Sequence, residues 1–158
     1  MNATIAPAKL GGTIPAIASK SDAHRLLILA ALSQGETRLL MDQRSEDIDA
    51  TIDCLRALGA RIEIEPKGVC VQGIGQAAES PLLDCRESGS TFRFLLPVAA
   101  TLCGRARFTG GGRLPERPIG ELLRVLQSHG VTFSAERLPF ETAGTLTGGT
   151  FSLPGHVS

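Results

Sequence analysis

The sequence contains no tryptophan and no tyrosine, and its 16 Lys and Arg balance its 16 Asp and Glu to a formal net charge of zero. A nucleic-acid surface needs excess positive charge and often uses aromatic side chains, so both shortages argue against one. No run of about 18 apolar residues occurs, which excludes a membrane-spanning helix. The opening MNATIAPAKL lacks the basic end and long apolar core of a secretory signal. We therefore expect a cytoplasmic protein without nucleic-acid or membrane partners.

Cysteine is present but forms no metal-binding or redox pattern. The four cysteines are widely spaced and include no CxxC pair: Cys54, Cys70, Cys85 and Cys103. We interpret them as reduced, partly buried thiols and expect neither a metal site nor a disulfide framework. The chain has 158 residues, of which 42% are hydrophobic and 20% charged, the composition of one ordinary globular domain with a sizeable core.

What the sequence does contain is an internal repeat. The stretch ALSQGETRLL (31–40) is echoed by ATLCGRARF (100–108), and CLRALGARIEI (54–64) is echoed by VLQSHGVTF (125–133). Two loose copies of one unit of about 70 residues are therefore present.

Each copy predicts the same order of elements. An apolar helix, AHRLLILAALS or STFRFLLPVAATL, is expected to end at Gly35 or Gly104 and to be followed by a short strand. Pro97 is expected to kink the second of these helices or to mark an irregular turn in it. An amphipathic helix comes next, capped by Ser45 in copy one and with Pro118 in its first turn in copy two. Gly59 or Gly130 ends it, and alternating strands follow.

The stretch SKSDAHR (19–25) stands at the start of the first apolar helix. Helix N-termini carry unpaired N–H groups and the positive end of the dipole, and they bind anions readily. Ser21, Lys20 and Arg25 add a hydroxyl and two cations there. The alternative is a purely structural role, in which the serines only cap the helix and Arg25 pairs with Asp22.

Two further stretches have the same character. RESGSTFR (86–93) offers Gly89, Ser90 and Thr91 at the second apolar helix, although Gly89 could be a simple turn residue. GGGRLPERPIG (110–120) brings Arg113 and Arg117 to another helix start, although the glycines could form a flexible loop and Glu116–Arg117 a solvated ion pair. Three such sites in one neutral chain indicate a substrate with several negative groups. No catalytic base is identifiable, and we interpret His24, His129 and His156 as surface or packing residues.

These stretches, together with the terminal LPGHVS, resemble the 5-enolpyruvylshikimate-3-phosphate synthase family, the 3-phosphoshikimate 1-carboxyvinyltransferases. The match runs in order from about Gly12 to Ser158. It implies an α/β fold (α+β in some schemes) of βαβαββ units, about two of the six in a whole enzyme, so we expect an N-terminal fragment. Residues 1–12 would form a strand belonging to the absent second domain. Residues 13–158 would form a partial domain, with repeat one at about 13–82, repeat two at about 83–152 and the start of repeat three at 153–158.

The resemblance also implies a reaction: transfer of the enolpyruvyl group of phosphoenolpyruvate to the 5-hydroxyl of shikimate 3-phosphate, in the pathway to chorismate and aromatic amino acids. It implies that this reaction needs neither a metal nor an organic cofactor. Carried over by motif, the residues for shikimate 3-phosphate are Lys20, Ser21, Arg25 and Ser158, and those for phosphoenolpyruvate are Lys20, Gly89, Ser90 and Arg117. Asp47 and Arg93 match supporting positions. The family's acid–base groups lie in a part that this chain lacks, so we expect no catalytic residue here and no turnover by the fragment alone.

Two alternatives stay open. The UDP-N-acetylglucosamine enolpyruvyl transferases share the repeats, but their first loop carries Lys-Asn where this chain has Lys20-Ser21, and their mobile loop carries a cysteine that 110–120 lacks. The other alternative is a non-catalytic anion-binding module. The whole enzyme is expected to be a monomer, whereas two repeats alone leave an apolar face uncovered and are expected to self-associate.

Overall fold

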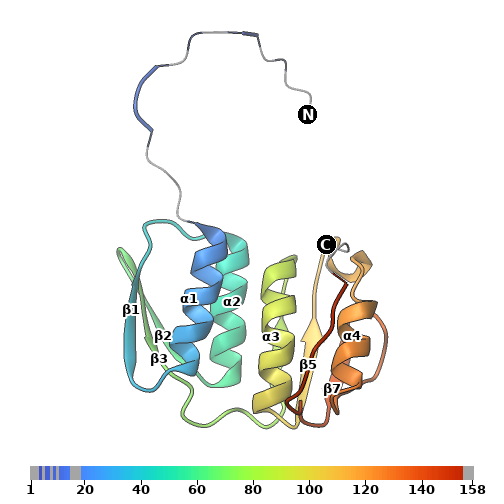
Figure 1. The fold of residues 1–158 in the computed structure, drawn as a ribbon. Coiled ribbons are helices and arrows are strands. Elements are labelled where there is room, and N and C mark those ends of the chain that lie inside the picture. Colours follow the sequence, from blue (N-terminus) through green and yellow to red (C-terminus); the bar gives the residue numbers. More distant parts are fainter. Residues whose placement is uncertain (1–3, 5, 8, 10, 15–18, 155–158) are drawn as a thin grey trace.

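The computed structural model describes residues 4, 6, 7, 9, 11–14 and 19–154. Within this part, helices are interspersed with strands along the chain, and the strands form two sheets (Figure 1). In order, the elements are α1 (Lys20–Leu32), β1 (Glu36–Leu40), α2 (Glu46–Leu58), β2 (Arg61–Glu65), β3 (Gly68–Gln72), β4 (Leu82–Asp84), α3 (Gly89–Leu102), β5 (Arg105–Thr109), the short 3-10 helix η1 (Leu114–Glu116), α4 (Gly120–Gln127), β6 (Thr132–Phe133) and β7 (Phe140–Ala143).

The predicted repeat is confirmed by the order of elements. The second copy runs β4, α3, β5, α4, β6, β7, which is a βαβαββ unit, and the first runs α1, β1, α2, β2, β3. The sheets agree as well, because the order β1-β3-β2 in one sheet corresponds to β5-β7-β6 in the other. The second sheet has β4 as an additional edge strand, parallel to β5. The expected strand at 1–12 falls partly outside the described residues and stays a prediction.

Alternating side chains explain why the strands bury one face. In β2, Ile62 is buried between the exposed Arg61 and Glu63, and it pairs with the buried Val71 of β3. The helices α1, α2 and α3 place their apolar faces against these sheets and each other, and the largest fully buried residues include Leu27, Leu55, Phe92, Leu95 and Phe108. Both copies thus share one continuous core.

Helix ends agree with the sequence at some positions and differ at others. Ser45 caps α2, and Gly59 ends it with a φ of 115°. The predicted ends at Gly35 and Gly104 are wrong, because α1 and α3 end at Leu32 and Leu102. Gly130 follows a turn after the end of α4, and Pro118 precedes the N-cap Ile119 instead of lying in the first turn. Pro97 lies inside α3, which continues through it to Leu102, so no irregular turn interrupts the helix.

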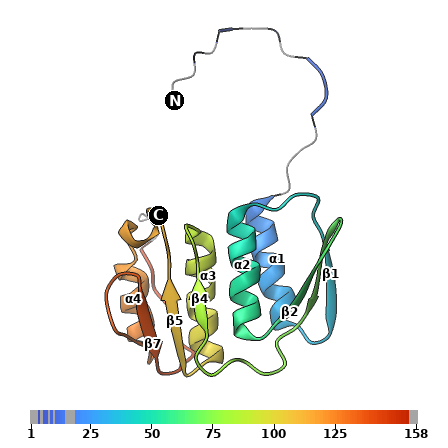
Figure 2. The ribbon, with the colours of Figure 1, turned by 180° about the vertical axis from the view of Figure 1, so that it is seen from behind.

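All four α-helices begin at the same end of the molecule, the upper end in Figure 1, and the strands behind them are seen in Figure 2. This arrangement brings the starts of α1 and α3 toward one common surface. Among the described residues, no helix is long and apolar enough to cross a membrane. All four cysteines are free thiols, and three of them, Cys54, Cys85 and Cys103, are buried.

Candidate anion-binding site

The start of α1 has both a structural cap and exposed cations. Ser19 caps the helix, since its hydroxyl accepts a hydrogen bond from the Asp22 amide at 3.3 Å. Lys20 and Ser21 lie in the first turn, where Lys20 Nζ pairs with Asp47 Oδ2 of α2 at 2.5 Å. The capping alternative is therefore correct for Ser19, while Ser21 stays free of that role and exposed to solvent.

Arg25 does not pair with Asp22, so this alternative to anion binding is wrong. Its Nη1 donates to the Ser21 carbonyl oxygen at 2.9 Å, and its guanidinium carbon lies 5.2 Å from the ring centroid of Phe94. Phe94 is on α3, so this cation–π contact joins the starts of the two helices. The guanidinium is thereby held between the two helix starts without a carboxylate partner among the described residues.

The start of α3 is built around Gly89, which is the first residue of the helix and not a turn residue. Ser88 caps this helix by accepting a hydrogen bond from the Thr91 amide at 3.2 Å. A Cβ atom added to Gly89 would lie 2.7 Å from Arg117 Nη1 and 2.8 Å from Arg93 Nη1. Glycine therefore leaves the space that two guanidinium groups occupy beside the helix N-terminus.

Arg93 and Arg117 lie side by side there. Arg93 donates to the carbonyl oxygens of Gly89 and Pro118 at 3.4 and 3.2 Å. Burial, and secondarily the positive charge of Arg117, lower the pKa of Arg93 from its ordinary value. Within the described residues neither arginine forms an ion pair with a carboxylate. Two guanidiniums without an ion-paired carboxylate, beside a helix N-terminus, make a site suited to a small anion.

The glycine-rich segment that carries Arg117 is not a flexible loop. The Gly111 amide donates to the Arg86 carbonyl oxygen at 2.6 Å, and the Arg113 amide donates to Glu87 Oε1 at 3.2 Å. Gly112 has a φ of 53°, and a Cβ there would lie 2.5 Å from the Glu87 carboxylate. Leu114 of η1 is buried and anchors the segment just before Arg117. The interpretation as a flexible loop is therefore wrong.

A hollow of about 950 Å³ lies over the start of α3. Its apolar lining includes Phe94, Leu122 and Leu153, and its polar lining includes Gly89, Ser90, Arg93, Arg117 and Glu121. The Glu121 carboxylate is paired with Arg124. The structure thus brings together three of the predicted phosphoenolpyruvate residues, namely Gly89, Ser90 and Arg117. Arg93, which we expected only in support, lines the same hollow. Lys20, Ser21 and Arg25 lie outside it on α1, and Ser158 lies outside the described residues.

Several residues of the site escaped sequence analysis. Glu87 pins the glycine-rich segment, and Phe94 supports Arg25, but neither role follows from local sequence. His24 is fully buried, in agreement with a packing role, and burial lowers its pKa although the Asp47 charge opposes this. Only its place on the inner face of the helical pattern could have indicated this burial.

Comparison with known proteins identifies the family. The family model for EPSP synthase (3-phosphoshikimate 1-carboxyvinyltransferase) matches residues 5–158. A 3-phosphoshikimate 1-carboxyvinyltransferase of Clostridium perfringens is 37% identical over 158 residues, covering 98% of this chain and 37% of that protein. The protein of the same name from Clostridium kluyveri is 38% identical with the same coverage.

Solved structures agree at the level of the fold. An EPSP synthase from Acinetobacter baumannii superimposes with a TM-score of 0.80 at 24% identity, covering 90% of this chain and 34% of that one. The chain thus spans little more than a third of the length of the relatives that it matches. Because the family model matches nearly the whole length of this chain, the chain belongs to the EPSP synthase family.

Proposed function

We propose that this chain forms the N-terminal part of an enzyme that transfers the enolpyruvyl group of phosphoenolpyruvate to the 5-hydroxyl of shikimate 3-phosphate. The observation that carries the proposal is the pair of arginines without carboxylate partners, Arg93 and Arg117, beside the start of α3. Phosphoenolpyruvate has a phosphate and a carboxylate on three carbons, and bidentate arginines suit both groups. The family membership supports the same substrate.

The reaction is an addition followed by an elimination. The 5-hydroxyl gives up its proton to a base as its oxygen bonds to C2 of phosphoenolpyruvate, and C3 takes up a proton from an acid, which gives a tetrahedral intermediate. The bond from C2 to the phosphate oxygen then breaks and C3 gives up a proton, so that inorganic phosphate leaves. In this scheme Gly89, Ser90 and Arg117 hold phosphoenolpyruvate, and Lys20 contacts both substrates.

Shikimate 3-phosphate is placed at the start of α1 in this proposal. Ser21 and Arg25 would contact it, and Ser158 would belong to the phosphate-binding part outside the described residues. Both Lys20 and Arg25 are exposed at this surface, within reach of a ligand. The Lys20–Asp47 pair holds the ammonium at the start of α1.

The proton transfers need an acid and a base that this chain is not proposed to supply. We therefore propose that the 158-residue chain alone turns over no substrate, and that the activity belongs to a protein with the remaining length of its relatives. Such a protein is proposed to be a cytoplasmic monomer, whereas the chain alone self-associates.

The UDP-N-acetylglucosamine enolpyruvyl transferase alternative loses support, because the matched family and the relatives above carry the other name. The other alternative, a non-catalytic anion-binding module, applies only to the 158-residue chain by itself. It agrees with the proposed lack of turnover, so we make no separate proposal for it.

A chimera tests the proposed activity. This chain would replace the matching N-terminal residues of the Clostridium perfringens relative, and phosphate release would be measured with both substrates. The expected result is release that requires phosphoenolpyruvate and shikimate 3-phosphate together, and none from the 158-residue chain alone. A folded chimera that releases no phosphate, or turnover by the isolated chain, would contradict the proposal.

A further inference from the structure

A network of hydrogen-bonded, buried polar side chains joins α1, α2 and α3 next to the candidate site. His24 Nδ1 lies 2.7 Å from Thr51 Oγ1, which lies 2.7 Å from Thr91 Oγ1, which in turn lies 2.7 Å from Ser88 Oγ. Three of these residues are fully buried and Ser88 is 1% exposed. An apolar core could pack the same helices, so four buried polar groups in contact call for a specific explanation.

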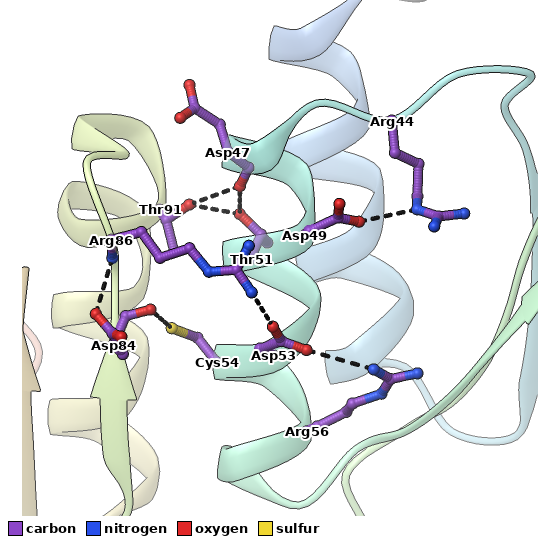
Figure 3. Close-up of polar contacts among 10 residues, drawn as sticks. All are labelled: Arg44, Asp47, Asp49, Thr51, Asp53, Cys54, Arg56, Asp84, Arg86 and Thr91. Carbon is purple, nitrogen blue, oxygen red and sulfur yellow. Dashed lines mark hydrogen bonds and ion pairs between the residues drawn. The ribbon is translucent and has the colours of Figure 1, made fainter.

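The carbonyl oxygen of Asp47 accepts hydrogen bonds from two members of this network. The hydroxyls of Thr51 and Thr91 both lie 3.2 Å from it, and Figure 3 shows the triangle that the three residues form. Asp47 uses its other end, the carboxylate, to hold Lys20 at 2.5 Å. Thr91 comes directly after Gly89 and Ser90, so Asp47 connects the start of α3 with Lys20 on α1.

The protons available favour one tautomer of His24. Its Nε2 is buried and has no partner among the described residues. A buried N–H without an acceptor is rarer than a buried acceptor without a donor, so the proton belongs on Nδ1. From there it is donated to Thr51. The Thr51 proton is then free for Thr91 or the Asp47 carbonyl oxygen, and the Thr91 proton for Ser88 or the same carbonyl oxygen.

We propose that His24, Thr51, Thr91 and Ser88 are positioning residues that fix the start of α1 relative to the start of α3, so that Lys20 faces the same ligand as Gly89, Ser90 and Arg117. This inference rests on the proposed function for the identity of the ligand. The fixed geometry itself is a property of the chain, and it can be tested without substrate.

The first test uses NMR on the 158-residue chain with labelled histidine. His24, assigned by the loss of its signals in His24→Asn, is expected to carry its proton on Nδ1. In Thr91→Val, which removes the hydroxyl at nearly constant shape, the amide signals of residues 20–25 are expected to shift. Thr91→Ser, which keeps the hydroxyl, should restore them. Thr101→Val makes the same change at an exposed position of α3 and should leave them unmoved.

A His24 proton on Nε2 in the wild-type chain would overturn the inference and needs no variant that could fail to fold. Unmoved 20–25 amides in a folded Thr91→Val chain would overturn it as well. In the chimera described above, Thr91→Val is expected to lower kcat/KM about tenfold or more, because small displacements of binding groups are costly in rate. Thr91→Ser and Thr101→Val should stay within about threefold of wild type. A chimera inactive in its wild-type form contradicts the proposed function, whereas the NMR result still decides this inference.

Discussion

A methyl group on Gly89 would lie 2.7 Å from Arg117 Nη1, although the rest of α3, strand β5 and the glycine-rich segment separate the two residues in sequence. Arg93 Nη1 lies almost as close, at 2.8 Å. Both clashing atoms are ends of flexible side chains, so a larger residue at this position moves the guanidiniums and leaves the backbone in place. Gly89 therefore controls where the positive charge of the site stands.

Gly89→Ala is expected to weaken phosphoenolpyruvate binding while leaving the fold intact. Alanine is compatible with a helix start, so the change in unfolding free energy should stay within about 1 kcal/mol. Displacing charged donors should cost about 1.5 kcal/mol or more of binding, roughly tenfold in affinity. Titration and thermal melting measure the two effects. Gly104→Ala, where an added Cβ meets nothing within 4 Å, is the control and should bind as wild type does.

The burial of His24 is expected to make the folded chain less stable in mild acid. Burial lowers its pKa in the folded chain from the ordinary value of 6.5, so the unfolded chain binds the proton more readily. Above that value His24 is neutral in both states and stability does not depend on it. As the pH falls below 6.5, stability is lost until the folded-state pKa is reached.

Urea unfolding at pH 8 and pH 5.5 measures this loss. Carboxylates also titrate toward the lower pH, so the informative quantity is the difference between wild type and His24→Asn. The variant should lose less stability between the two pH values than wild type does. Equal losses in the two proteins would show that His24 does not titrate in the way its burial implies.

Arg86 is a non-glycine residue with a φ of 49°, a conformation that costs roughly 1–2 kcal/mol for an L-residue. Its guanidinium pairs with Asp53 Oδ2 at 2.5 Å, and its amide donates to Asp84 Oδ1 at 3.0 Å (Figure 3). Both partners of the ion pair are about half exposed, so the pair contributes only about 0–1 kcal/mol. The free-energy cost of the backbone conformation is therefore larger than the stabilisation that the ion pair provides.

Arg86→Gly is consequently expected to be more stable than Arg86→Ala by about 1 kcal/mol, because both lose the ion pair but only glycine relieves the strain. Chemical denaturation of the two variants gives the comparison. Arg107, in extended conformation on β5 and paired with Glu141, is the matched control. There the order should reverse, with alanine more stable than glycine.

Self-association is predicted from three leucines on one side of α1. Leu26, Leu29 and Leu32 are 49%, 63% and 46% exposed, although they lie on a helix whose other side is core. Sedimentation over a wide concentration range should show association of the wild-type chain and its loss in Leu29→Lys. Leu40→Lys, an equally drastic change at a residue of β1, should associate as wild type does. A wild-type chain that stays monomeric throughout would contradict the prediction.

The sequence predicted the repeat and most elements because both rest on local patterns. Ser45 and Gly59 mark the ends of α2 through their own backbone and hydroxyl chemistry. Gly35 and Gly104 do not mark the ends of their helices, because each lies in the turn after its helix and the backbone leaves the helix earlier. The α/β fold of repeated units is confirmed by the element order and by the similarity to a solved EPSP synthase.

The candidate site was predictable only in part. Arg117 and Gly89 were found as separate anion-suited residues, but their contact depends on how α3 packs beside the glycine-rich segment. The positions of Arg93 and Glu87 depend on the same packing. The hydrogen-bonded network from Ser88 to His24 depends on contacts among three helices that are distant in sequence. Such relationships follow from tertiary structure, which local patterns do not specify.

The most direct test of the account is a titration of the 158-residue chain with phosphoenolpyruvate, followed by NMR, in wild type, Arg117→Ala and Arg113→Ala. Both variants lose one exposed arginine of the same segment, but only Arg117 stands against Gly89. The account predicts saturable binding whose shifts centre on Gly89 and Ser90, weakened about tenfold by Arg117→Ala and little by Arg113→Ala. Absence of saturable binding, or equal weakening by both variants, would contradict it.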